Sequence, residues 1–191
     1  MTSALRLRDL LRRFHANEDG VVTVEFVIIF PVFMTFFLMT YESGMISLRH
    51  FALERAVDVV VRDVRIGAIP NPTRNTLRAN ICDVARLLPD CENQLQLEMI
   101  RRDLRNWVDV PDTVQCIDRG AEVQPVVEFT SGGNNELIFL RACVRLDPVL
   151  PTSPLGRTIV DANANSAAGG SYALVSTTAF VVEPFRNTPG S

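Results

Sequence analysis

The sequence predicts an α+β protein, in which a long N-terminal membrane helix continues into an exported domain with a second helix and a small antiparallel sheet. Three observations support this prediction. An apolar block fills residues 21–41, the hydrophobic period changes from helical to two after Pro89, and four cysteines lie beyond residue 80. At 191 residues the chain has room for one modest domain. Hydrophobic residues make up 47% and charged residues 21%, values typical of folded proteins.

The apolar block is long enough to cross a bilayer. Residues 21–41 reach about 30 Å as a helix, the thickness of the hydrocarbon layer. A cleavable secretory signal has a shorter apolar region and a small-residue cleavage site, and neither is present. We therefore expect a transmembrane helix over 21–41 that stays with the protein.

Arginine placement predicts the orientation of this helix. Residues 1–20 carry four arginines, whereas the twenty residues after the block carry only Arg49 and Arg55. Positive charge favours the cytoplasmic side of a membrane. Residues 1–20 are thus expected to be a cytoplasmic arm of a single-pass inner-membrane protein, with the C-terminal part in the periplasm.

Two residues inside the block need a physical cause. Pro31 removes a backbone donor and frees the carbonyl of Val27, so a kink or a packed neighbour is expected there. Glu25 lies about 6 Å into the block. Either it reaches water at the headgroups, or it has a specific cationic partner, since a carboxylate inside a membrane is costly and usually functional.

The spacing around Glu25 favours a specific partner. Gly20 precedes VVTVEF, so Glu25 and Phe26 are the fifth and sixth residues after the glycine. This pattern resembles the processing site of type IV prepilins. The resemblance implies that a membrane prepilin peptidase cuts after Gly20, and that the new amine of Val21 pairs with Glu25 of a neighbouring subunit.

Beyond the block, residues 42–69 are expected to extend the same helix, without a breaker before Pro70. Apolar residues at helical spacing form one stripe along it: Ile46, Leu53, Val57, Val60 and Val64. A second helix is predicted over 72–88, starting near Pro72. Its apolar positions are Leu77, Ile81, Val84 and Leu88.

Residues 70–191 form the predicted α+β domain, in which strands are indicated by alternation of apolar and polar residues. They are expected around residues 94–99, 122–130, 136–147 and 172–183. Pro125 suggests an edge position, and Gly132-Gly133 suggests a hairpin between the second and third runs. Residues 161–170, DANANSAAGG, read as a loop of small residues.

Four cysteines allow three pairings. Their spacing lacks the C-x2-C knuckles of zinc sites, and no metal site is expected. Cys82 and Cys91 bracket the end of the second helix, while Cys116 and Cys143 belong to the sheet region. In an exported chain we expect disulfides Cys82–Cys91 and Cys116–Cys143, reduced thiols being the alternative.

The whole layout resembles the TadE/TadG-like proteins, pilin-like minor components of the tight-adherence (Tad, type IVc) pilus system. The segments that carry the resemblance are GVVTVEF, LLPDC, QPVVEF, NELIFLRACVRLDP and YALVSTTAF. It implies a pilin-like fold, packing of the N-terminal helix in the inner membrane, and a place at the base or tip of a pilus. The implied partners are other pilin-like subunits, the prepilin peptidase and the inner-membrane assembly platform.

No enzyme signature accompanies this layout. The nucleophile-elbow, zincin, P-loop and dinucleotide motifs are missing, so we predict no catalytic residue, cofactor or small-molecule substrate. The net charge of −3 also argues against nucleic acid. Trp107 is expected to pack in the domain, and Arg141 and Arg145 to lie on a solvated sheet face or at a subunit contact. The competing function is an anchored ligand-binding or receptor module unrelated to pili.

Overall fold

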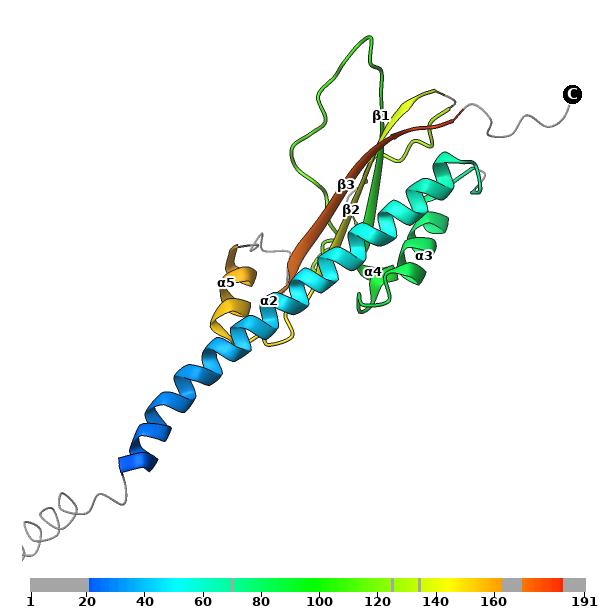
Figure 1. Cartoon of the computed structure of the whole chain (residues 1–191). Helices are drawn as coiled ribbons and strands as arrows, with labels where there is room; N and C mark the ends of the chain where they lie inside the picture. Colours follow the sequence, from blue (N-terminus) through cyan, green and yellow to red (C-terminus); the bar gives the residue numbers. More distant parts are fainter. Residues whose placement is uncertain (1–20, 70, 125, 134, 163–169, 184–191) are drawn as a thin grey trace, which may run out of the picture. The chain divides into compact units, whose positions relative to one another are not determined.

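The computed structural model describes residues 21–69, 71–124, 126–133, 135–162 and 170–183 (Figure 1). The chain forms two compact units, one up to Thr40 and a second unit from Tyr41 onward. Helix α2, Val21–Arg65, contributes to both. The predicted arm 1–20, with Gly20, lies outside the described residues, as do Pro70, Pro125 and most of the loop 161–170.

The second unit contains a three-stranded antiparallel sheet in the order β1-β2-β3. Its strands are β1, Leu95–Arg102, β2, Leu137–Leu146, and β3, Tyr172–Val181. Met99 lies opposite Leu140, and Leu140 lies opposite Thr178. The predicted α+β class and the small antiparallel sheet are therefore confirmed.

The core lies between one face of this sheet and helices α2 and α3 (Figure 1). The predicted stripe of α2 supplies Leu53, Val57, Val60 and Val64, all buried, and Ile46 packs against them. The sheet contributes alternate residues of each strand, among them Leu97, Met99, Ile138, Leu140, Leu174 and Phe180. The inward residues of all three strands therefore follow the period of two that is typical of strands with one face on the core.

Helix α2 ends at Arg65, four residues before the predicted end of the extension. Gly67 adopts φ 79°, a left-handed conformation that glycine reaches without strain. The N–H of Ala68 donates to the carbonyl of Asp63 at 2.9 Å, and that of Gly67 to Val64 at 3.2 Å. These two bonds form a Schellman cap, which ends the helix before Pro70 can.

Helix α3, Arg74–Val84, is shorter than the predicted 72–88. The hydroxyl of Thr73 caps its start by accepting the N–H of Thr76. Leu77 and Ile81 are buried as predicted, but Val84 is exposed and Leu88 is buried outside the helix. The chain turns back after Val84 into the short helix α4, Cys91–Gln94.

The predicted strand over 122–130 is wrong. Of the described residues of this run only Phe129 pairs, in a single parallel bridge with Met99 on the free edge of β1. Val123 is 82% exposed, whereas Val127 is buried and Phe129 packs against the core, yet the described residues of this run form one bridge and no ladder. The hairpin predicted at Gly132-Gly133 is therefore also wrong, because β2 pairs with β1 and β3.

Two helices escaped prediction, the short helix α4 and a longer helix, α5. Helix α5 spans Pro154–Ala162, between β2 and β3. The hydroxyl of Ser153 accepts the N–H of Gly156 at 2.9 Å, and Pro154 follows as the first helical residue. A serine cap followed by proline is a sequence signal for a helix start that could have located α5.

Candidate functional site

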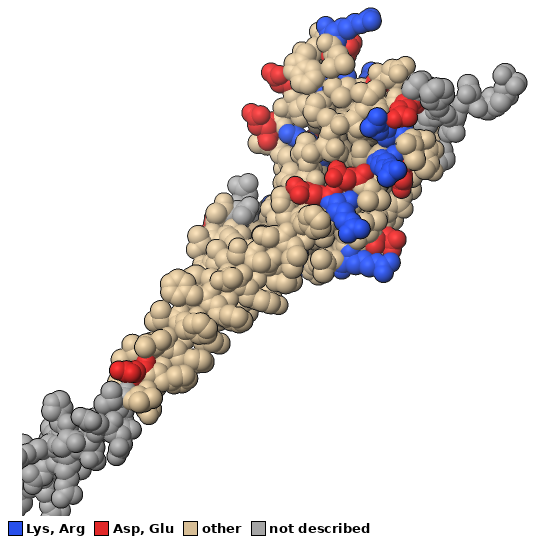
Figure 2. Space-filling view, in the orientation of Figure 1, with Lys and Arg blue, Asp and Glu red and all other residues tan. Residues whose placement is uncertain are grey.

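The first unit presents an apolar helix surface. Most of its large side chains are more than half exposed: Val22, Val24, Phe26, Val27, Ile28, Ile29, Val32, Phe33, Phe36 and Phe37. Among the described residues, α2 is the one helix long and apolar enough to cross a membrane. Figure 2 shows this stretch almost free of charge. Such a surface fits lipid or neighbouring protein, consistent with single-pass membrane anchoring.

Glu25 interrupts this surface with one carboxylate. Its side chain is exposed and has no partner among the described residues. Phe26 stacks on Phe30 with ring centroids 4.9 Å apart, so the two aromatic side chains support one another along the helix. Val21 is the first residue of α2. A cation for Glu25 would therefore come from outside the described residues.

Pro31 lies inside α2 without ending it. The hydroxyl of Thr35 donates to the Pro31 carbonyl at 2.8 Å, and Thr40 donates to Phe36 at 2.9 Å. These side-chain bonds keep both hydroxyls paired within the helix, as an apolar surrounding requires. A kink at Pro31 stays a prediction.

In the second unit, Glu42 is fully buried one residue after the apolar block. Its two carboxylate oxygens accept the backbone N–H groups of Val149 and Leu150 at 2.9 and 2.8 Å. Two charge-assisted hydrogen bonds offset the cost of burying the carboxylate. Glu42 thus fixes the loop after β2 to the start of this part of α2.

Arg49 makes the next contact along the same helix. Its guanidinium donates to the Asp147 carbonyl and to the Tyr172 hydroxyl, both at 2.9 Å. Burial raises the pKa of Tyr172, although the bond from Arg49 acts in the opposite direction. Glu42 and Arg49 together attach α2 to both ends of the β2–β3 connection.

The second face of the sheet is covered over β1 and β2, contrary to the prediction of a solvated face there, whereas outward residues of β3 such as Val175 and Val181 are exposed. Arg141 and Glu98 lie directly opposite on β2 and β1, both buried, with a guanidinium–carboxylate distance of 3.4 Å. Arg141 also donates to the carbonyl of Pro111, and Arg145 to that of Ile117 at 2.9 Å. The segment 103–124 therefore supplies carbonyl partners to both arginines and covers them.

Both predicted disulfides are present. Cys116–Cys143 joins the covering segment to β2, and Cys82–Cys91 joins α3 to α4. The covered face thus has one covalent attachment in addition to the arginine bonds. Sequence reasoning missed this cover because segment 103–121 has no regular hydrophobic period to place it.

The described residues contain no group of three or more His, Cys, Asp and Glu side chains that could hold a metal ion.

Trp107 packs less than expected. It is 50% exposed, and its ring meets that of Phe139 edge-on, with the ring centroids 6.1 Å apart. Asp90 precedes α4, and its carboxylate accepts the side-chain amides of Gln94 and Asn93, which lower its pKa. This carboxylate therefore has a structural explanation.

These features define a class of protein: one helix able to span a membrane, followed by a disulfide-bonded α+β unit. Residues 20–62 match the family model described as TadE-like protein, which confirms the resemblance for this segment and links it to the Tad pilus system. The match contains Gly20 and Glu25 and covers less than a quarter of the chain. No curated protein and no solved structure matches, so the pilin-like fold stays a prediction.

Proposed function

We propose that the protein is a structural, minor pilin-like component of a Tad-type pilus, packed through its N-terminal helix in the bacterial inner membrane. The observation that carries this proposal is the TadE-like match over the Gly20-to-Glu25 spacing and the exposed apolar helix. The N-terminal arm is then cytoplasmic and the second unit is periplasmic. The partners are pilin-like subunits, the prepilin peptidase and the assembly platform.

The role of Glu25 follows from helix geometry. Cleavage after Gly20 would give Val21 a free amine, four residues before Glu25 on α2. Four residues rise about 6 Å, too far for a good pair within one helix. A neighbouring subunit shifted along the axis brings its own amine level with Glu25. The buried carboxylate then sets the register between the two helices.

The test is a Glu25→Gln strain in which the variant is the only copy of the protein. We expect an inserted, processed protein with weakened co-assembly and piliation, whereas Glu54→Gln on the same helix serves as a control with normal piliation. Gly20→Ser should act earlier and leave the arm attached, as mass spectrometry of the mature N-terminus would show. Normal piliation with Glu25→Gln would exclude this role and leave Glu25 as a carboxylate that reaches water at the headgroups.

A further inference from the structure

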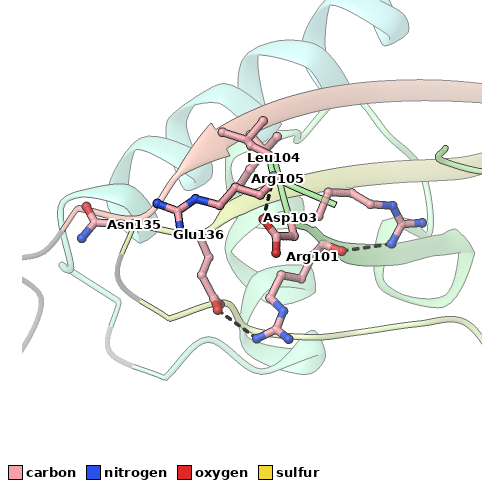
Figure 3. A pocket seen from close by; sticks show the side chains of 8 residues that line it. Arg101, Asp103, Leu104, Arg105, Asn135 and Glu136 are labelled. Atoms are coloured by element: carbon pink, nitrogen blue, oxygen red, sulfur yellow. Dashed lines mark hydrogen bonds and ion pairs between the residues drawn. The ribbon is translucent and has the colours of Figure 1, made fainter. Parts of the chain in front are cut away.

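A recess of about 410 Å³ lies where β1 ends and β2 begins (Figure 3). Residues 101–105 and 135–137 line it. Three arginines and two carboxylates face one another here: Arg101, Arg102, Arg105, Asp103 and Glu136. The recess is therefore rich in charge, with a positive excess.

Both carboxylates already have partners. Glu136 accepts from Arg101 at 2.9 Å and from the N–H of Gly133 at 2.6 Å, and Asp103 accepts the N–H of Arg105 at 2.8 Å. The Arg105 guanidinium is exposed and has no partner among the described residues. In Figure 3 it lies apart from the Arg101–Glu136 pair. Arg105 is thus available to a carboxylate from outside.

Two apolar side chains next to Arg105 are exposed, and one of them, Trp107, is held in place. Leu104 is 72% exposed and Trp107 is 50% exposed. The indole N–H of Trp107 donates to Asp109 at 2.8 Å, and its ring rests on Phe139. Arginine and tryptophan beside exposed aliphatic groups are typical of the residues that dominate protein–protein binding. We name Leu104, Arg105 and Trp107 the basic patch.

A turn elsewhere in the second unit offers the complementary chemistry. The Gln124 amide accepts the N–H of Asp118 at 2.9 Å and donates to the Asp118 carbonyl at 2.8 Å, which closes the turn. At its tip Glu122 is exposed without a partner among the described residues, beside the exposed Val123. We name Glu122 and Val123 the acidic tip.

We propose that second units of two copies dock head to tail, the acidic tip of one copy against the basic patch of the next. Glu122 would pair with Arg105 while Val123 covers Leu104 and Trp107. Asp118 and Gln124 of the turn border a hollow with Gln94 and Asp147, at the opposite end of the β1–β2 pair from the basic patch. The contact joins two different surfaces, so it can add copies in a row. It goes beyond the proposed function, which concerns the first unit.

Trp107 is the only tryptophan of the chain and reports this contact directly. The full chain in neutral detergent is studied by Trp107 emission and sedimentation velocity over a range of concentrations. We expect a blue shift of emission as copies associate, since docking buries the indole. Arg105→Glu and Glu122→Arg should each raise the concentration needed by about tenfold or more. Arg55→Glu, an exposed charge reversal on α2, is the matched control.

The decisive variant carries both reversals, Arg105→Glu with Glu122→Arg, and should restore association. Non-reducing peptide mapping checks that each variant keeps both disulfides. A wild-type chain with constant Trp107 emission, single reversals without effect, or no rescue in the folded double variant would overturn the proposal. Glu25→Gln should leave the Trp107 shift unchanged, so a failure of this contact and a failure of the helix-packing role are distinguishable.

Discussion

The burial of Glu42 shows how a single charged residue can join distant parts of the chain. Its partners, Val149 and Leu150, lie more than a hundred residues away in the sequence. A glutamate directly after an apolar block looks like an ordinary polar flank, so no local pattern could reveal its role. Arg141 escaped prediction for the same reason, because its cover comes from residues such as Pro111 that have no period.

Replacing Glu42 by glutamine should destabilise the second unit by about 2–3 kcal/mol. The amide keeps one acceptor oxygen but turns its NH₂ group toward a backbone donor that remains buried. Denaturant unfolding of the full chain, followed by near-UV circular dichroism, gives the change. Glu54→Gln, exposed on the same helix, should change the free energy of unfolding by less than about 0.5 kcal/mol.

Tyr172 should make stability fall at alkaline pH. Burial raises its folded-state pKa above the ordinary value of 10.0, so the folded state holds the phenolic proton more tightly than the unfolded chain. This contribution is complete below pH 10 and is lost as the pH rises through the folded-state pKa. Urea midpoints between about pH 8 and about pH 11 should therefore drop less steeply in Tyr172→Phe than in the wild type. Equal slopes in the two proteins would contradict this assignment.

At the scale of elements, helix ends marked by a capping residue could be predicted. The alternation of apolar and polar residues alone did not predict whether a strand forms. Thr73 and Gly67 stand at the helix ends that they define. Residues 122–130 alternate as well as a strand does, and Val127 and Phe129 face the core, yet the described residues form only one bridge to β1. A period of two shows only that alternate residues differ in polarity. Whether a hydrogen-bonded ladder forms depends on the neighbouring segments of the chain.

Replacing two glycines by alanine, one within α2 and one in its C-terminal cap, should change stability in opposite directions. Gly67→Ala places a side chain at φ 79° and should cost about 1 kcal/mol. Gly44 lies within the helix, and a Cβ there would meet nothing within 4 Å, so Gly44→Ala should stabilise by up to about 1 kcal/mol. Thermal unfolding of both variants measures the pair. A destabilising Gly44→Ala would contradict the open surroundings of that residue.

Removing Cys116–Cys143 should loosen the cover of the sheet. The chain-entropy relation gives a loss of about 3.6 kcal/mol for this loop and about 2.7 kcal/mol for that of Cys82–Cys91. Limited proteolysis of the Cys116→Ala/Cys143→Ala variant should cut within residues 103–124. The Cys82→Ala/Cys91→Ala variant is the control, and its segment 103–124 should stay protected. Equal protection in both variants would mean that the arginine bonds suffice.

For the whole molecule, composition and period predicted the class correctly because each unit has its own signal. The apolar block marks the first unit, and helical stripes followed by alternation mark the second. The helices pack on one face of the sheet and segment 103–124 packs on the other, and long-range contacts decide both arrangements. Those contacts, such as Glu98 with Arg141, leave no trace in local spacing.

The second unit is expected to be periplasmic and fully oxidised in the cell. Non-reducing peptide mapping of protein purified from the envelope should recover Cys82–Cys91 and Cys116–Cys143 and no free thiol. A protease added to spheroplasts should digest this unit, and in the unprocessed Gly20→Ser variant it should spare residues 1–20. Four free thiols, or protection of the second unit, would place it on the other side of the membrane.

The order of the two disulfides has a consequence for biogenesis. Each disulfide joins two cysteines that are consecutive in the sequence, Cys82 with Cys91 and Cys116 with Cys143. The loop closed by one disulfide therefore contains no cysteine of the other. If the second unit is exported as proposed, the residues nearest α2 cross the membrane first, so Cys82 and Cys91 arrive before Cys116 and Cys143. Oxidation during export can then form the native disulfides without later disulfide exchange. A thiol oxidase alone should suffice, whereas disulfides with nested loops would need an isomerase.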